Sequence, residues 1–190
     1  MFNWLYDNWA KLSIFLAIIV ALLIFVFVKP DNIVLFLIWI QLPIYLLHQF
    51  EEHYWKGFKN YINRNIFKIK EDDFPLNDKI IFWINIPIVW ILIPIFAGLS
   101  SINLTFGLWI PYFAVFNSLT HVIVSLRNQE YNPGLIVSLI LGIPVGVYAL
   151  IIFYSYIAVP TIISIISIFF AILLHLIIFG SIILIRRRNF

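Results

Sequence analysis

The sequence HQFEE, which begins at His48, places side chains that can bind a metal ion or move protons inside an otherwise apolar stretch. On a helix, His48 lies three residues from Glu51 and four from Glu52, and both spacings place side chains on one helical face. A second apolar stretch carries Asn117 and His121, again four residues apart. Imidazole and carboxylate groups are the usual ligands of zinc, iron and manganese.

These side chains predict one open metal site, with His48, Glu52 and His121 as ligands. Whichever of Glu51 and Glu52 is not a ligand can act as general base on a bound water. Asn117 can hydrogen-bond a ligand or a substrate carbonyl. A two-metal carboxylate site would need Glu-x-x-His on two helices, and only one stretch here carries carboxylates. The expected cofactor is therefore a single divalent ion, zinc first, with iron and manganese as alternatives.

A structural interpretation stays open. Buried His and Glu can pair with each other and with Arg127 and thereby lock helices together, and the two glutamates can lie in water at the headgroup level. His175 stands alone among Leu and Ile, which fits a helix–helix hydrogen bond better than a ligand. His53 is expected to face away from His48 and to lie at the membrane interface.

The elements that position these groups must be membrane helices. The chain of 190 residues is 63% hydrophobic and 11% charged, whereas soluble domains carry about 25% charged residues. This composition cannot make a soluble surface. The chain contains no cysteine, which excludes disulfides and thiolate chemistry, and its net charge of +3 forms no basic stripe of the kind that binds nucleic acid.

Six apolar stretches predict an all-α, polytopic transmembrane bundle in a single membrane domain, 1–190. The predicted spans are 12–28, 32–54, 79–98, 104–126, 135–157 and 161–185. Their apolar residues run all the way round each helix, as lipid-facing helices require, and no stretch shows the alternation of a transmembrane β-strand. Asp7 stands where a signal peptide would have a basic cluster, which favours a retained first helix. Gly142-x-x-x-Gly146 is typical of close helix packing.

The basic residues predict the orientation, because cytoplasmic loops of membrane proteins are rich in Lys and Arg. With both termini in the cytoplasm, all but Lys29 of the 12 Lys and Arg residues fall on the inner side, most of them in the predicted cytoplasmic loop 55–78 or at the C-terminus. The aromatic and apolar residues of that loop recur near helical spacing, which is compatible with an amphipathic helix on the inner leaflet at its start. A plain solvated loop is an equal alternative. Along their helices, His48 lies roughly 10 Å from Lys56 and His121 roughly 9 Å from Arg127. Both histidines are therefore expected at one depth, near the inner face. The expected location is the plasma (inner) membrane of a prokaryote.

Three motifs together resemble the signatures of the HXXEE family of integral membrane proteins: His48-x-x-Glu51-Glu52, Asn117-x-x-x-His121 and Tyr131-x-Pro133-Gly134. They occur in the family's order and span residues 48 to 134, so the first helix is an addition before the family core. The family has no settled activity. The resemblance therefore implies which residues matter, adding Tyr131 to Glu51, Glu52 and Asn117 as candidate catalytic residues. The metal follows from residue chemistry alone.

Three functions are compatible with these patterns. The first is a membrane-embedded, single-metal hydrolase or lipid-modifying enzyme that acts on a lipid or amphipathic substrate from the inner leaflet. The second is a small transporter coupled to protons or cations, which needs a polar path across the whole membrane and is disfavoured by the apolar outer halves of the helices and by the lack of an internal repeat. The third is a non-catalytic interaction or immunity-type protein, whose contact surface would be the loop 55–78.

Overall fold

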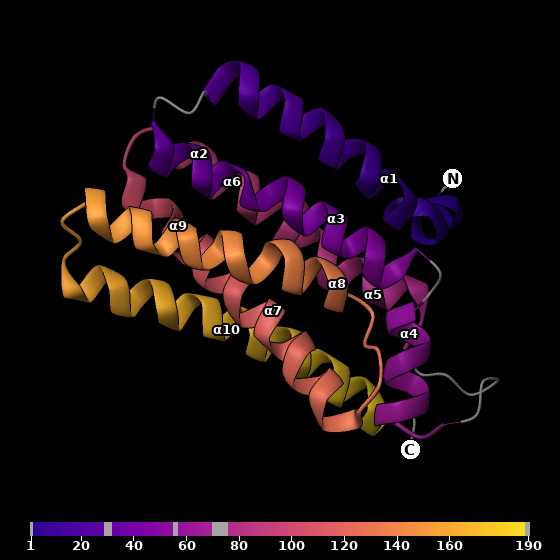
Figure 1. Cartoon of the computed structure of the whole chain (residues 1–190). Coiled ribbons are helices and arrows are strands. Elements are labelled where there is room, and N and C mark those ends of the chain that lie inside the picture. The colour runs from indigo at the N-terminus through magenta and orange to yellow at the C-terminus, as the bar shows by residue number, and fades with distance from the viewer. Residues whose placement is uncertain (1, 29–31, 55–56, 70–75, 189–190) are drawn as a thin grey trace.

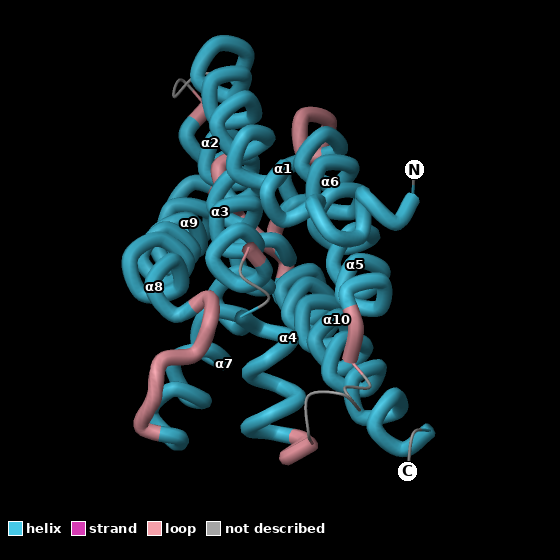
Figure 2. Tube along the Cα trace, turned by 90° about the vertical axis from the view of Figure 1, so that its right-hand side faces the viewer, coloured by secondary structure: helices cyan, strands magenta, loops and turns pink. Residues whose placement is uncertain are grey.

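Helices form all the regular secondary structure of the residues described, 2–28, 32–54, 57–69 and 76–188, in a computed structural model of the chain (Figures 1 and 2). Six helices are long and apolar enough to cross a membrane: Asn3–Val28, Ile33–His53, Asp78–Leu99, Leu104–Asn128, Leu135–Tyr156 and Thr161–Leu184. The predicted all-helical bundle with six spans is confirmed, and the protein is an integral membrane protein. The cytoplasmic placement of both termini stays a prediction.

Most spans consist of an α-helix joined end to end with a shorter helical segment. The successive elements are α1 (Phe2–Leu23) and η1 (Ile24–Val28); α2 (Ile33–Trp39) and α3 (Gln41–His53); α5 (Asp78–Ile86), η4 (Pro87–Leu92) and α6 (Ile93–Leu99); η5 (Leu104–Gly107) and α7 (Trp109–Asn128); α8 (Leu135–Val137), η6 (Ser138–Gly142) and α9 (Ile143–Tyr156); and α10 (Thr161–Arg188). The elements η1, η4 and η6 are π-helical, and η5 is a 3₁₀ turn.

The first span begins at Phe2, ten residues before its predicted start at residue 12. Its early residues are helical because Trp9 and Ala10 are buried, with the Trp9 ring packed against Phe82 at 6.2 Å between ring centroids. Hydropathy alone underestimated this helix, since its first turns carry Asn3, Asp7 and Asn8 on other faces. The other predicted boundaries lie within two residues of the observed spans.

The two spans that carry the candidate site are the most buried of the bundle. Over the apolar 18-residue stretch of each span, 61% of the residues are buried inside the protein in the second span and 50% in the fourth. In the other spans the buried share is 33% or less. In Figure 1, α7 lies between α9 and α10, and α1 runs along the α2–α3 side of the bundle. The other spans therefore separate α3 and α7 from lipid over much of their length.

Small residues let the fifth span approach α7 closely. A Cβ atom added at Gly142 would overlap the Ser118 side chain, and one at Gly146 would lie 2.8 Å from Val115 Cγ2. The π-helical segment η6 ends at Gly142, two residues before Pro144, which has no N–H for the helix ladder. The predicted small-xxx-small packing is confirmed, and it fixes the fifth span beside α7.

The segment between the second and third spans is helical over α4 (Gly57–Tyr61) and η2 (Ile62–Ile66). Asn63 of η2 holds the chain just before the third span, because its Nδ2 donates to the Leu76 carbonyl at 3.0 Å and its Oδ1 accepts from the Leu76 N–H at 3.3 Å. The basic and acidic residues at positions 29, 56 and 70–73, on which the orientation argument partly rests, lie outside the described residues.

Candidate metal centre

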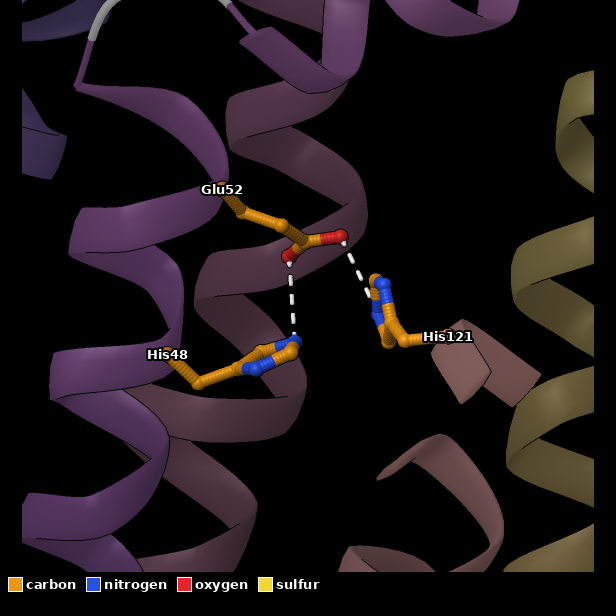
Figure 3. Close-up of side chains that lie close together, drawn as sticks. All are labelled: His48, Glu52 and His121. Carbon is orange, nitrogen blue, oxygen red and sulfur yellow. Dashed lines mark ion pairs between the residues drawn. The ribbon is translucent and has the colours of Figure 1, made fainter. Parts of the chain in front are cut away.

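One turn of α3 places a histidine and a glutamate on the same buried face. His48 and Glu52 are 4% and 7% exposed, and their Nε2 and Oε2 atoms lie 3.6 Å apart (Figure 3). Both side chains point into the bundle because the i, i+4 spacing carries them to one face of the helix. A carboxylate so far from water needs partners that donate hydrogen bonds or carry positive charge.

The fourth span supplies such a partner in His121, which is 6% exposed. Its Nε2 lies 3.4 Å from Glu52 Oε1, and its ring stands nearly at right angles to that of His48, with 4.6 Å between centroids. The potential ligand atoms of His48, Glu52 and His121 all lie within 4.8 Å of one another. Ligands of a tetrahedral zinc ion with bonds of about 2.1 Å are separated by about 3.4 Å. The group predicted from the sequence is thus brought together with spacing that fits one metal ion.

Asn117, one turn before His121 on α7, completes the contact between the two helices. Its Nδ2 lies 3.0 Å from His48 Nε2, and as a donor it leaves the lone pair of His48 on Nε2. In the neutral ring the proton is then carried by the other nitrogen, Nδ1. Asn117 therefore holds His48 in the form that binds a metal through Nε2.

Gly134 fills the space beneath both imidazoles. Its φ is +97°, a conformation that side chains other than glycine rarely adopt. A Cβ atom there would lie 2.6 Å from His48 Cε1 and 2.9 Å from His121 Cε1. The Nδ1 atom of His121 has no hydrogen-bond partner among the described residues, so this ring is held chiefly by packing. The glycine of the Tyr-x-Pro-Gly motif thus packs directly against both histidines of the cluster.

Glu51 makes a different set of contacts from Glu52, its neighbour in sequence. Its Oε1 accepts from the Ile136 N–H at 2.9 Å, and its Oε2 accepts from the Val137 N–H at 2.7 Å. These N–H groups belong to the first turn of the fifth span, where they lack intrahelical partners and favour negative charge. Glu51 therefore caps the helix that follows the Tyr-x-Pro-Gly turn and joins it to α3.

Tyr131 reaches the same carboxylate. Its hydroxyl donates to Glu51 Oε1 at 2.8 Å. Burial, followed by the hydrogen bond and the charge of Glu51, raises the pKa of Tyr131 above its ordinary value. The hydroxyl is consequently a donor at neutral pH. Beside it, Asn132 is buried, and its Nδ2 donates to the His121 carbonyl at 3.4 Å, which ties the turn to α7 as well.

Sequence reasoning missed the position of His53, which was expected at the interface facing away from His48. It is 8% exposed, its Nε2 lies 3.2 Å from Glu52 Oε2, and its ring packs 5.0 Å from that of Trp9. The early start of α1 buries it. Glu52 therefore has three imidazoles around it, whereas Arg127, the partner considered in the structural interpretation, is exposed on α7.

A polar network behind the cluster was also missed. Gln49 Nε2 lies 3.4 Å from Asn85 Oδ1, and Trp90 Nε1 donates to Gln49 Oε1 at 2.8 Å. A small cavity of about 20 Å³ lies between this network and the cluster, with Glu52 and Asn117 in its wall, and a space of this size holds about one water molecule. The signal available in the sequence was Asn85, a lone amide in an apolar span.

His175 lies outside the group that can hold a metal. Its Nδ1 is 2.8 Å from the Ala171 carbonyl, one turn earlier on α10, and its ring packs against Phe113 at 4.5 Å between centroids. The expected hydrogen bond between helices is not found, since the bond of Nδ1 stays within α10 and Nε2 has no partner among the described residues.

The family model for proteins of unknown function with the HXXEE motif matches residues 39–149, more than half of the chain. The matched segment contains His48, Glu52 and His121 together with Glu51, Asn117, Tyr131 and Gly134, whereas α1 and α10 lie outside it. No curated protein and no solved structure matches the chain.

We expect Gly134→Ala to disrupt the cluster. The new methyl group meets both imidazoles and forces an unfavourable φ, so the free energy of unfolding should fall by about 1–3 kcal/mol, measured as loss of thermal stability in detergent. Gly180→Ala is the matched control, because a Cβ atom there meets nothing within 4 Å. Equal stability of the two variants would contradict the role assigned to Gly134.

Removing the cap should destabilise the protein in a graded order. Glu51→Ala loses the acceptor of two N–H groups and of the Tyr131 hydroxyl, and charge-assisted hydrogen bonds contribute about 1.5–3 kcal/mol each. Glu51→Gln should lose less, and Tyr131→Phe least, in the same thermal measurement. Glu130→Gln, at an exposed carboxylate, is the control. A loss from Tyr131→Phe as large as that from Glu51→Ala would show that the helix cap contributes little.

Proposed function

Because the chain belongs to the HXXEE family, to which no function is assigned, we propose a function from the buried cluster itself: a membrane-embedded hydrolase with one divalent metal, acting on a lipid or amphipathic substrate. The observation that carries this proposal is the convergence of His48, Glu52 and His121, whose potential ligand atoms lie within 4.8 Å of one another in a buried place. Two imidazoles and one carboxylate are a ligand set of catalytic zinc sites that leave one position open for water.

The metal is held by His48 Nε2, His121 Nε2 and one oxygen of Glu52. Zinc fits the ligand set best, and iron or manganese can replace it. The small cavity beside Glu52 and Asn117 has room for one water, which such a metal would activate. Metal binding lowers the pKa of such a water toward neutrality and makes it a nucleophile.

When bound, such a metal would supply a water activated for attack on a carbon or phosphorus atom of the substrate, with displacement of an alcohol. The Glu52 oxygen that does not hold the metal would take the proton of this water and pass it to the leaving alcohol. With His48 Nε2 engaged by the metal, the Asn117 amide would donate to the oxygen on which negative charge develops. Glu51 and Tyr131 support the reaction by positioning, since both Glu51 oxygens accept N–H groups of the fifth span.

The cluster lies where α3 and α7 end, on the same side of the bundle as the amphipathic segment α4–η2. We place this end at the cytoplasmic face, as the distribution of Lys and Arg favours, in the inner membrane of a prokaryote. A substrate from the inner leaflet then meets the site without crossing the membrane.

Metal analysis tests the first half of the proposal. The pure full-length protein should hold about one divalent ion per chain, and His48→Ala or His121→Ala should lower metal affinity by at least about tenfold. His175→Ala is the matched control, because the imidazole of His175 is buried outside the cluster. A folded, metal-free wild-type protein that takes up no zinc, iron or manganese would exclude the metal and leave the transporter and interaction-protein hypotheses. Glu52-dependent ion flux in liposomes would then favour the transporter.

Hydrolysis can be tested without knowing the substrate. The metal-loaded protein is incubated in water enriched in ¹⁸O with vesicles made from membrane lipids, and products are examined by mass spectrometry for one ¹⁸O atom in a carboxylate or phosphate group. Asn117→Ala should keep its metal and lose about 100-fold in rate, and Glu52→Gln should lose both. Metal-loaded wild type that incorporates no ¹⁸O into any lipid would contradict the hydrolase and retain the metal site.

A further inference from the structure

A large apolar groove lies at the end of the bundle opposite the cluster. It has a volume of about 380 Å³ and is formed by α6, η5 and the start of α7 on one side and by α10 on the other. Trp109 in its wall precedes His121 by 12 residues on α7, which corresponds to about 18 Å along the helix. The groove is therefore separate from the candidate metal centre.

One hydrogen-bond donor in this groove has no acceptor. Ser167 on α10 lines the groove, is 5% exposed and donates to nothing that the structure describes. In contrast, Ser155 and Ser181 each donate to the carbonyl four residues earlier at 2.7 Å, as serine in membrane helices commonly does. The Nε1 atom of Trp109 also has no partner among the described residues, but it is enclosed by the protein and does not open into the groove.

An unsatisfied donor in apolar surroundings is costly, so an acceptor at this place would be stabilising. Apart from Thr105, whose hydroxyl donates to Asn103 Oδ1 at 2.8 Å, the rest of the lining is apolar. The rings of Phe96, Trp109 and Phe170 pack edge to face or tilted, with 5.1–6.0 Å between centroids. The fitting ligand is consequently apolar over most of its length and carries an oxygen acceptor at one point. The volume is that of a ligand site, about 300–1,000 Å³.

We propose that this groove binds the ester-linked acyl chain of a bilayer lipid, with the ester carbonyl accepting a hydrogen bond from Ser167. Ser167 lies six residues inside the start of α10 at Thr161, about 9 Å along the helix. A lipid carbonyl therefore reaches it from the nearer leaflet, and the hydrocarbon chain continues into the aromatic part of the groove. A second copy of the chain would need to bring its own acceptor to this depth.

The test compares two photoreactive lipids in vesicles that contain the full-length protein. Both carry a diazirine at the same chain position, but one chain is ester-linked and the other ether-linked, so that only the first has a carbonyl. We expect the ester lipid to label residues 163–173 or 104–109 about fivefold more than the ether lipid, the effect of roughly one hydrogen bond. Equal labelling by the two lipids, or cross-links between two protein chains at these residues, would overturn the proposal.

Variants locate the donor. Ser167→Ala should reduce the preference for the ester lipid, and Ser167→Leu should exclude both lipids by filling the groove. Ser155→Ala is the matched control, because Ser155 already has an acceptor. Trp109→Phe should leave the preference unchanged, because Trp109 Nε1 does not open into the groove. An ester preference that is unchanged in Ser167→Ala would also count against the site. Metal content is expected to stay constant throughout, so this result is independent of the proposed hydrolase.

Discussion

The burial of one carboxylate determines much of the inner architecture of this protein. Glu52 is 7% exposed in a membrane-spanning bundle, where an uncompensated charge would be too costly to keep. Three imidazoles from α3 and α7 surround it, with contacts between 3.2 and 3.6 Å. That requirement brings the two spans together at this depth, and the turn with Gly134 then packs beneath the rings.

The adjacent residues Glu51 and Glu52 have the same side chain but make contacts on different sides of α3. Successive residues on an α-helix point about 100° apart, since 3.6 residues make one turn. Glu52 consequently faces α7, whereas Glu51 faces the start of the fifth span and caps its free N–H groups. The pair therefore links one helix to two neighbours, and the second link holds the turn that supports both histidines.

Much of this arrangement could be predicted from the sequence, because the signals are local or are imposed by the bilayer. Apolar length gave six spans, and four-residue spacing gave the shared faces of His48 with Glu52 and of Asn117 with His121. The depth argument correctly placed both faces at one level. What failed depended on contacts between distant residues: His53 was expected at the interface, but Trp9 of the longer first helix buries it. Similarly, no local pattern distinguishes a capping glutamate from a ligand, and Asn85 was passed over because its partner Gln49 comes from another span.

The segment shared with the HXXEE family ends before α10 and begins after α1, yet both of these helices border the cluster. Trp9 of α1 covers His53, and Ile178 of α10 lines the cavity beside Glu52. The residues of the cluster thus lie in the shared segment, whereas part of their surroundings is encoded outside it. Changes in the flanking helices can therefore alter the space around the cluster while His48, Glu52 and His121 stay the same.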